Sequence, residues 1–250
     1  MTRERISLIP TSLVLIVALM IAALPRAVGA GPPVITAADS TFDFGYVPQQ
    51  STLVFATWLR NPGPDTTQIN SIRTGCGCLT TLVQGERIPP ADSIRVLMYW
   101  QTRAARGPVA KSAYIYTSGS QDPLTLAVSG RVMGASEEPA AFNWAPLRLQ
   151  FDSTEGPGAA RSLELRSNGG GRLSVLKVEY SGERLSLDIP GEVPPDGRAD
   201  GRVTLRQRAG VFEESFTLET SDENGYTYRV SVPVAGGESS RRPRFTTTGK

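Results

Sequence analysis

The sequence contains no histidine and only two cysteines among its 250 residues. Without histidine the chain can form neither a Ser-His-Asp nor a Cys-His catalytic arrangement, and it has no imidazole to act as a general base or metal ligand. Charged residues at 20% and hydrophobic residues at 40% are ordinary proportions for a folded protein. We therefore predict a folded protein that is not an enzyme.

Long apolar runs are also scarce, and the single clear one lies near the N-terminus. Residues Leu13–Leu24 are uninterrupted apolar residues, with Arg3 and Arg5 before them and the small residues Ala27–Ala30 after them. This order is typical of a secretory signal peptide, and the run is shorter than the roughly 20 residues that a membrane span needs. We therefore predict that residues 1–30 are a signal peptide and that the mature protein is periplasmic or extracellular. An uncleaved signal that anchors the protein in the membrane is the alternative.

The mature chain has no excess of charge of either sign. Removal of the leader leaves 23 basic and 23 acidic side chains, and residues 237–250 carry a local excess of three positive charges. We expect these last residues to be a disordered basic tail. Because no basic face is visible in the body of the chain, we predict no nucleic-acid binding, and we predict no stable membrane span after signal cleavage.

Short segments rich in β-forming residues follow one another along the mature chain, separated by turns rich in Gly and Pro. No sustained helical periodicity occurs outside the leader. In the first half the expected strands are 41–44, 53–59, 68–72, 79–83, 93–100, 112–117 and 124–132. In the second half they are 147–151, 162–165, 173–180, 185–189, 202–205, 215–220 and 227–234. The last two of these flank Asn224-Gly225, which favours a type I′ hairpin turn.

The second half repeats the first. Phe44 and Phe151 are each followed 17 residues later by an asparagine, Asn61 and Asn168, and apolar residues near 124–128 correspond to Val230–Val234. Such a degenerate repeat predicts an all-β protein of two tandem immunoglobulin-like β-sandwich domains behind the signal peptide. We expect the domains at residues 34–133 and 142–236, with a linker over 134–141.

The first half carries a recognisable order of motifs. Phe42-Asp43-Phe44-Gly45 is followed by a strand that ends in Asn61-Pro62-Gly63, by Cys76-Gly77-Cys78, by Pro89-Pro90 and by Gly130-Arg131-Val132. This order resembles a bacterial domain-of-unknown-function family that is related to Hydin-like and ASH-like immunoglobulin modules, themselves similar to major sperm protein. The resemblance covers about residues 38–133. It implies an immunoglobulin-like fold and an exported location. It does not indicate a biochemical activity, because none is established for the family.

Cys76 and Cys78 are the strongest candidates for a redox or metal-binding role. In an extended strand their Cβ atoms would lie roughly 7 Å apart, beyond the reach of a disulfide, although the neighbouring glycines permit a tighter bend. Three interpretations stay open: a structural pair, a redox-active or partner-linking disulfide, and a soft-metal site. Two thiolates suit copper(I), and Met98 is the candidate third donor.

Aromatic side chains give a second set of candidates. Tyr114 and Tyr116 lie two residues apart on one strand, so they would form a flat contact surface for a partner if both were exposed. We expect the remaining aromatic residues of the first half to fill the core of the sandwich: Phe42, Phe44, Phe55, Trp58, Tyr99 and Trp100.

These observations favour an exported, non-catalytic binding or scaffolding protein that recognises a protein or cell-envelope partner through a sheet edge or a loop. One alternative is a periplasmic thiol-redox or copper-handling protein that acts through Cys76 and Cys78. The other is a pilus-type chaperone, which would use Arg131 in an interdomain cleft and residues 124–128 as an edge strand.

Overall fold

The structure is a computed structural model that describes residues 35–134, 137, 142–168 and 170–237. The predicted signal peptide (1–30) and most of the predicted linker (134–141) lie outside the described residues. The predicted basic tail lies outside them as well, apart from its first residue. No helix among the residues listed above is long and apolar enough to cross a bilayer.

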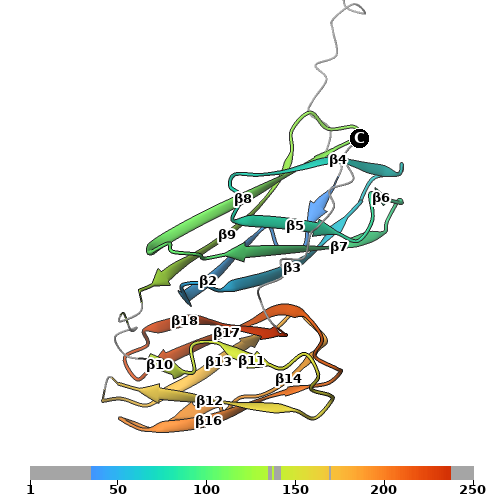
Figure 1. Cartoon of the computed structure of the whole chain (residues 1–250). Helices are drawn as coiled ribbons and strands as arrows, with labels where there is room; N and C mark the ends of the chain where they lie inside the picture. Colours follow the sequence, from blue (N-terminus) through green and yellow to red (C-terminus); the bar gives the residue numbers. More distant parts are fainter. Residues whose placement is uncertain (1–34, 135–136, 138–141, 169, 238–250) are drawn as a thin grey trace, which may run out of the picture. The chain divides into compact units, whose positions relative to one another are not determined.

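The described residues are all-β and form two sandwiches, as the alternating pattern predicts (Figure 1). In the first sandwich one sheet has the order β1-β3-β7-β5 and the facing sheet the order β2-β9-β8-β4-β6. The strands of this sandwich are β1 (Thr36–Ala37), β2 (Thr41–Pro48), β3 (Thr52–Arg60), β4 (Thr67–Thr74), β5 (Leu79–Val83), β6 (Arg87–Ile88), β7 (Ser93–Gln101), β8 (Gly107–Thr117) and β9 (Leu124–Met133).

The second sandwich repeats this topology strand for strand. Its sheets have the orders β10-β12-β16-β14 and β11-β18-β17-β13-β15, so β10 corresponds to β1 and β18 to β9. The parallel pair β2–β9 has its counterpart in the parallel pair β11–β18. The strands are β10 (Phe142–Ala145), β11 (Leu149–Phe151), β12 (Ala160–Ser167), β13 (Leu173–Glu179), β14 (Leu185–Asp188), β15 (Glu192–Val193), β16 (Arg198–Leu205), β17 (Phe212–Asp222) and β18 (Thr227–Gly236).

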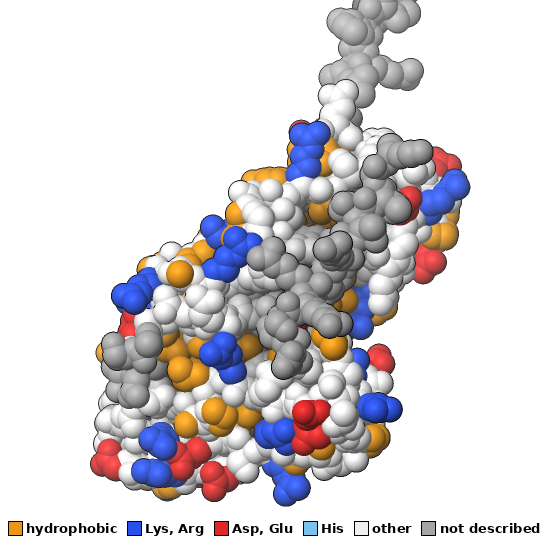
Figure 2. Space-filling model, viewed as in Figure 1, with side chains coloured by type: hydrophobic (Ala, Val, Ile, Leu, Met, Phe, Trp, Pro, Cys, Tyr) orange, Lys and Arg blue, Asp and Glu red, His pale blue; other side chains and the backbone are white. Residues whose placement is uncertain are grey.

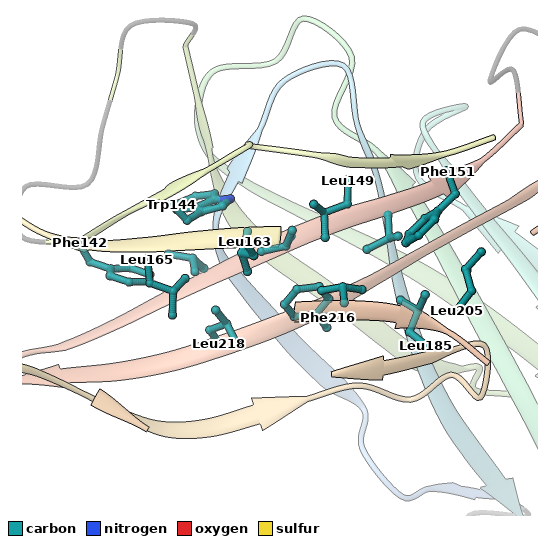
Figure 3. Close-up of a cluster of buried hydrophobic side chains, with 14 of the residues drawn as sticks. Phe142, Trp144, Leu149, Phe151, Leu163, Leu165, Leu185, Leu205, Phe216 and Leu218 are labelled. Atoms are coloured by element: carbon teal, nitrogen blue, oxygen red, sulfur yellow. The ribbon is translucent and has the colours of Figure 1, made fainter. Parts of the chain in front are cut away.

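Each sandwich has its own hydrophobic core, built from alternate residues of its strands. In the first core Phe44, Phe55 and Trp100 are buried, with Phe44 and Trp100 ring centroids 5.8 Å apart. The second core contains Phe142, Trp144 and Phe216 (Figure 3). The predicted repeat is therefore visible in space.

One strand pair joins the sandwiches. β18 pairs in parallel with β2 at Val230 and Tyr46, while its C-terminal part pairs with β11. The buried Ser231 hydroxyl donates to the carbonyl oxygen of Phe44 at 2.7 Å. Gly45 lies in a bulge of β2 with φ of +64°, and a Cβ added there would lie 2.0 Å from the carbonyl oxygen of Arg229. Close backbone contact at this point therefore depends on glycine.

Two local predictions are wrong. The turn between β17 and β18 is not type I′, because Gly225 has a positive φ and Asn224 does not. Instead the Asp222 carboxylate accepts the backbone N–H groups of Asn224 and Tyr226, at 2.9 and 3.0 Å. The second concerns two aromatic residues that were expected in the core but face outward: Trp58 on β3 is 51% exposed, and Tyr99 on β7 alternates with the buried Met98 and Trp100.

Candidate functional site

A groove of about 640 Å³ lies between the sandwiches, and its floor is the outer face of the β3–β7 sheet. Val54 of β3 lies opposite Tyr99 of β7, and Leu97 is the next outward-facing residue of β7. The outer face of an antiparallel sandwich sheet is commonly polar, so an apolar floor is unusual. The apolar surface continues along β3 to the exposed Trp58, which the outward alternation of the strand places on the same side. This volume is within the range of ligand-binding pockets.

The second sandwich provides the opposite wall of the groove. It contributes the segment Tyr180–Arg184, which follows β13, and residues Val211–Ser215 at the start of β17. Val211 is one of the most exposed apolar side chains in the described part of the chain, at 64%. The groove therefore has a floor in which Val54, Leu97 and Tyr99 form an apolar centre between polar residues, and a mixed polar and apolar wall.

Glu214 is the centre of a cluster of ionisable groups in this wall. The Tyr180 hydroxyl donates to its carboxylate, and the Arg184 Nε lies 3.7 Å from its other oxygen. Burial raises the pKa of Glu214 above its usual value, although Tyr180, Arg184 and Arg95 oppose the shift. The pKa of Tyr180 is raised by burial and then by its bond to Glu214. This part of the wall is therefore largely desolvated.

Tyr99 belongs to the same electrostatic environment. Its pKa is raised, first by burial and then by the nearby carboxylates of Glu214 and Glu213. Partial burial and two neighbouring carboxylates therefore both favour the protonated phenol at this point of the groove floor.

Direct hydrogen bonds join the two sandwiches at both ends of the groove floor. At one end the Ser215 hydroxyl accepts the backbone N–H of Val54 at 2.8 Å and lies 3.2 Å from its carbonyl oxygen, and Thr52 donates to Glu213 at 2.9 Å. At the other end Arg95, which lies opposite Trp58 in the strand register, donates to the carbonyl of Ser181. The outer face between these two contacts forms the floor of the groove.

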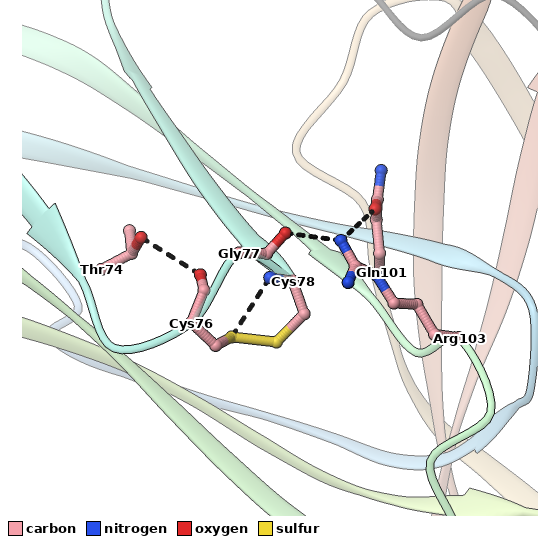
Figure 4. The surroundings of a disulfide bond; sticks show 6 residues. All are labelled: Thr74, Cys76, Gly77, Cys78, Gln101 and Arg103. Carbon is pink, nitrogen blue, oxygen red and sulfur yellow. Dashed lines mark hydrogen bonds between the residues drawn. A yellow bond between two sulfur atoms is a disulfide. The ribbon is translucent and has the colours of Figure 1, made fainter.

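Cys76 and Cys78 are joined by a disulfide in the turn that connects β4 and β5 (Figure 4). Their Cα atoms are 5.2 Å apart, because the chain bends at Gly75 and Gly77 rather than continuing as a strand. Both cysteines are half-buried and contact the first core, whereas both glycines are exposed. In this state neither sulfur is a thiolate, so a copper site would require reduction of the pair first.

The copper hypothesis also named Met98. This residue is fully buried in the first core and lies opposite Thr81 of β5 in the strand register. No group of three or more Cys, Asp or Glu side chains within the described ranges is arranged to hold a metal ion. The soft-metal interpretation stays a prediction.

The disulfide turn is connected to the groove. The Arg103 guanidinium donates to the carbonyl of Gly77 at 2.6 Å (Figure 4). The backbone N–H of Gln101 donates to the carbonyl of Cys78 at 2.8 Å. Both Gln101 and Arg103 also line the groove. Gln101 and Arg103 thus connect the disulfide turn to the groove.

Tyr114 and Tyr116 do not form the flat exposed pair that the sequence suggested. Tyr114 is 38% exposed, but Tyr116 is half-buried, and the guanidinium of Arg73 lies 5.2 Å from the centre of its ring. Neither tyrosine lines the groove.

Of the two features named for the chaperone alternative, one is placed differently. β9, which contains 124–128, lies between β2 and β8 and is not an edge strand. Arg131 forms an ion pair with Glu137 at 2.9 Å; it does not line the groove, but it lines a second hollow between the sandwiches, together with Glu219 and Arg229 of the second sandwich. The basic residues of the groove are Arg95, Arg103 and Arg184.

The first sandwich matches a known protein family. Residues 35–132 match the family model described as a protein of unknown function, DUF1573. The resemblance predicted from the Phe42–Gly45 and Cys76–Cys78 motifs is therefore confirmed over these residues. The DUF1573 region contains the floor of the groove and the disulfide, and the opposite wall lies outside it. No curated protein matches the sequence.

Solved structures share the general architecture at low identity. A protein of unknown function from Porphyromonas gingivalis W83 is 11% identical, with a TM-score of 0.33, and 81% of this chain aligns with 99% of it. WR4, an MSP family member from C. elegans, is 14% identical with a TM-score of 0.33. The match covers 40% of this chain and 100% of the WR4 chain. The Pseudomonas aeruginosa CupB2 chaperone is 12% identical with a TM-score of 0.28. The match covers 78% of this chain and 98% of the chaperone chain. At such scores these likenesses carry no functional argument.

Sequence reasoning missed the groove, because its residues are distant in sequence and individually ordinary. Val54 and Ser215 are separated by 161 residues. The one available signal was the run of outward-facing apolar residues in β3, where Val54, Ala56 and Trp58 alternate with core residues that are also apolar. A strand that is apolar on both faces indicates that both faces are covered or bind something.

Proposed function

We propose that the protein is an exported, non-catalytic binding protein and that the groove receives an extended segment of a partner protein. The observation that carries the proposal is the set of apolar side chains on the outer face of the β3–β7 sheet, which lie between the points where the second sandwich contacts this sheet, at Val54 and at Arg95. Apolar side chains of an extended segment would pack on Val54, Leu97 and Tyr99. The polar groups of the facing wall would form hydrogen bonds with the backbone of that segment.

The charge distribution is consistent with protein recognition. Three arginines and three glutamates line the groove, so the groove as a whole has no net positive charge that would select a polyanion. On the face seen in Figure 2, basic and acidic side chains are interspersed over the second sandwich. Such mixed surfaces favour orientation of a partner over attraction by net charge.

A peptide selection tests the proposal. A random-peptide phage library would be selected on the mature chain, and the affinity of a selected peptide would then be measured by calorimetry. We expect Leu97→Arg to weaken binding at least tenfold, because it introduces a charge into the apolar floor. Leu176→Arg is the matched control, since Leu176 is an exposed leucine on β13 outside the groove. Equal affinity for both variants, or failure to select any peptide, would contradict the proposal.

Export is part of the same proposal and rests on residues 1–30. Protein purified from an exporting host should have an intact mass that begins at Gly31. Retention of the leader on membrane-associated protein would instead support the anchored form.

A further inference from the structure

We propose that the Cys76–Cys78 disulfide is a thiol–disulfide exchange site, in which Cys78 is the sulfur attacked and Cys76 is the leaving thiolate. This inference is independent of the groove as a peptide-binding site. It starts from the small size of the loop that the disulfide closes. The two cysteines are two positions apart, so the bond restrains the unfolded chain very little and contributes little to stability.

The second sandwich provides an internal comparison. Its β13–β14 connection corresponds to the β4–β5 connection that contains the disulfide, and it contains no cysteine. There the Tyr180 hydroxyl accepts the backbone N–H of Leu185 at 3.0 Å. The same connection therefore forms without a disulfide in the same chain, which weakens a purely structural explanation for the pair.

The environment of the two sulfurs is unequal. The backbone N–H of Cys78 points at Cys76 Sγ, with an N–S distance of 3.3 Å. A nearby N–H donor stabilises a thiolate, and the thiol with the lower pKa is the better leaving group in exchange. Among the hydrogen bonds of the described residues, one N–H is donated to Cys76 Sγ and none to Cys78 Sγ.

The turn lies at the surface of the first sandwich. Gly75 and Gly77 are exposed, and a Cβ added at Gly77 would meet no atom within 4 Å. Cys76 and Cys78 are themselves only partly buried, so the disulfide is not enclosed in the core that it contacts.

The reaction needs a dithiol as reductant. Its first thiolate attacks Cys78 Sγ, the S–S bond breaks, and the electron pair leaves on Cys76 Sγ. The second thiol of the reductant, as its thiolate, then attacks the reductant sulfur of the mixed disulfide and releases Cys78. The reductant ends as a disulfide, two electrons have passed to the cysteine pair, and the protons of the two reductant thiols balance the two new thiols. The reverse direction would oxidise a partner dithiol.

The position of attack can be measured on the unmodified protein. Oxidised protein would be treated with reduced glutathione, quenched with acid, alkylated and analysed by peptide mass spectrometry. We expect glutathione on Cys78 and the alkyl group on Cys76, in at least tenfold excess over the opposite pattern. An equal distribution, attachment to Cys76, or reaction only under conditions that unfold the protein would overturn the proposal.

Two single variants test the cause of the asymmetry. Cys78→Ala keeps the backbone N–H that faces Cys76, whereas Cys76→Ala leaves Cys78 without that arrangement. The pH dependence of alkylation should give a thiol pKa for Cys76 in the first variant that is at least one unit below that of Cys78 in the second. Equal thiol pKa values in the two cysteine variants would contradict the assigned roles.

Discussion

Gly45 offers the sharpest test of how the two sandwiches are joined. Its φ of +64° already disfavours a side chain by about 1–2 kcal/mol. In addition, the Cβ of an alanine would lie 2.0 Å from the Arg229 carbonyl oxygen, whereas ordinary contacts begin near 3.4 Å. Because the obstacle is backbone, β18 would have to move away, and the buried hydrogen bond from Ser231 to Phe44 would be strained or lost. That loss costs about 1–3 kcal/mol. We expect Gly45→Ala to destabilise the protein by about 3–5 kcal/mol.

Gly107→Ala is the matched control. Gly107 also has a positive φ, of +74°, but a Cβ there would meet nothing within 4 Å. It should therefore cost only about 1–2 kcal/mol. Both variants would be measured by urea unfolding, followed through tryptophan fluorescence. If Gly45→Ala were no more destabilising than Gly107→Ala, the close approach of β18 to β2 would not contribute to the stability of the folded chain, and our reasoning would be wrong.

Two further predictions concern single buried groups. Burial raises the folded-state pKa of Glu214, so its contribution to stability is most favourable at low pH and is lost as the pH rises through that pKa. Glu214→Gln keeps an acceptor for Tyr180, and its free energy of unfolding should exceed that of the parent at pH 8, with an excess that shrinks toward pH 4. The fully buried Asn61 donates to the carbonyls of Asp65 and Ile88 and accepts the N–H of Gly63, so Asn61→Ala should cost about 2–4 kcal/mol in urea unfolding. Asn168→Ala, at the exposed counterpart, should change stability by less than about 0.5 kcal/mol, and equal effects would refute this account.

The fold was predictable because hydrophobic alternation and turn chemistry are local signals. Each strand expected from the sequence coincides with a strand of the structure, and Phe44 and Phe151 occupy corresponding buried positions in β2 and β11. Strands of two residues, such as β1 and β6, are too short to show any alternation. Trp58 was assigned to the core for its size, although its position in the alternation of β3 points outward.

The candidate site was predictable only in part. Two cysteines separated by one glycine are conspicuous in any sequence, and the structure places them in one turn. Their connection to the groove depends on Gln101 and Arg103, which belong to β7 and the residues after it and carry no motif. Pairings such as Ser215 with Val54 arise from the packing of one sandwich on the other, which no local pattern encodes.

The pairing of β18 with β2 has a consequence for the order in which the protein can mature. β2 is the second strand of the chain as described and β18 the last, so one edge of β2 acquires its partner only when Thr227–Gly236 has been synthesised. Until then the N-terminal sandwich presents an unpaired strand edge to its surroundings, which is the kind of surface that promotes aggregation. A long-range parallel pairing of this type also forms slowly. Truncation of the last strand would therefore expose this edge of β2 permanently.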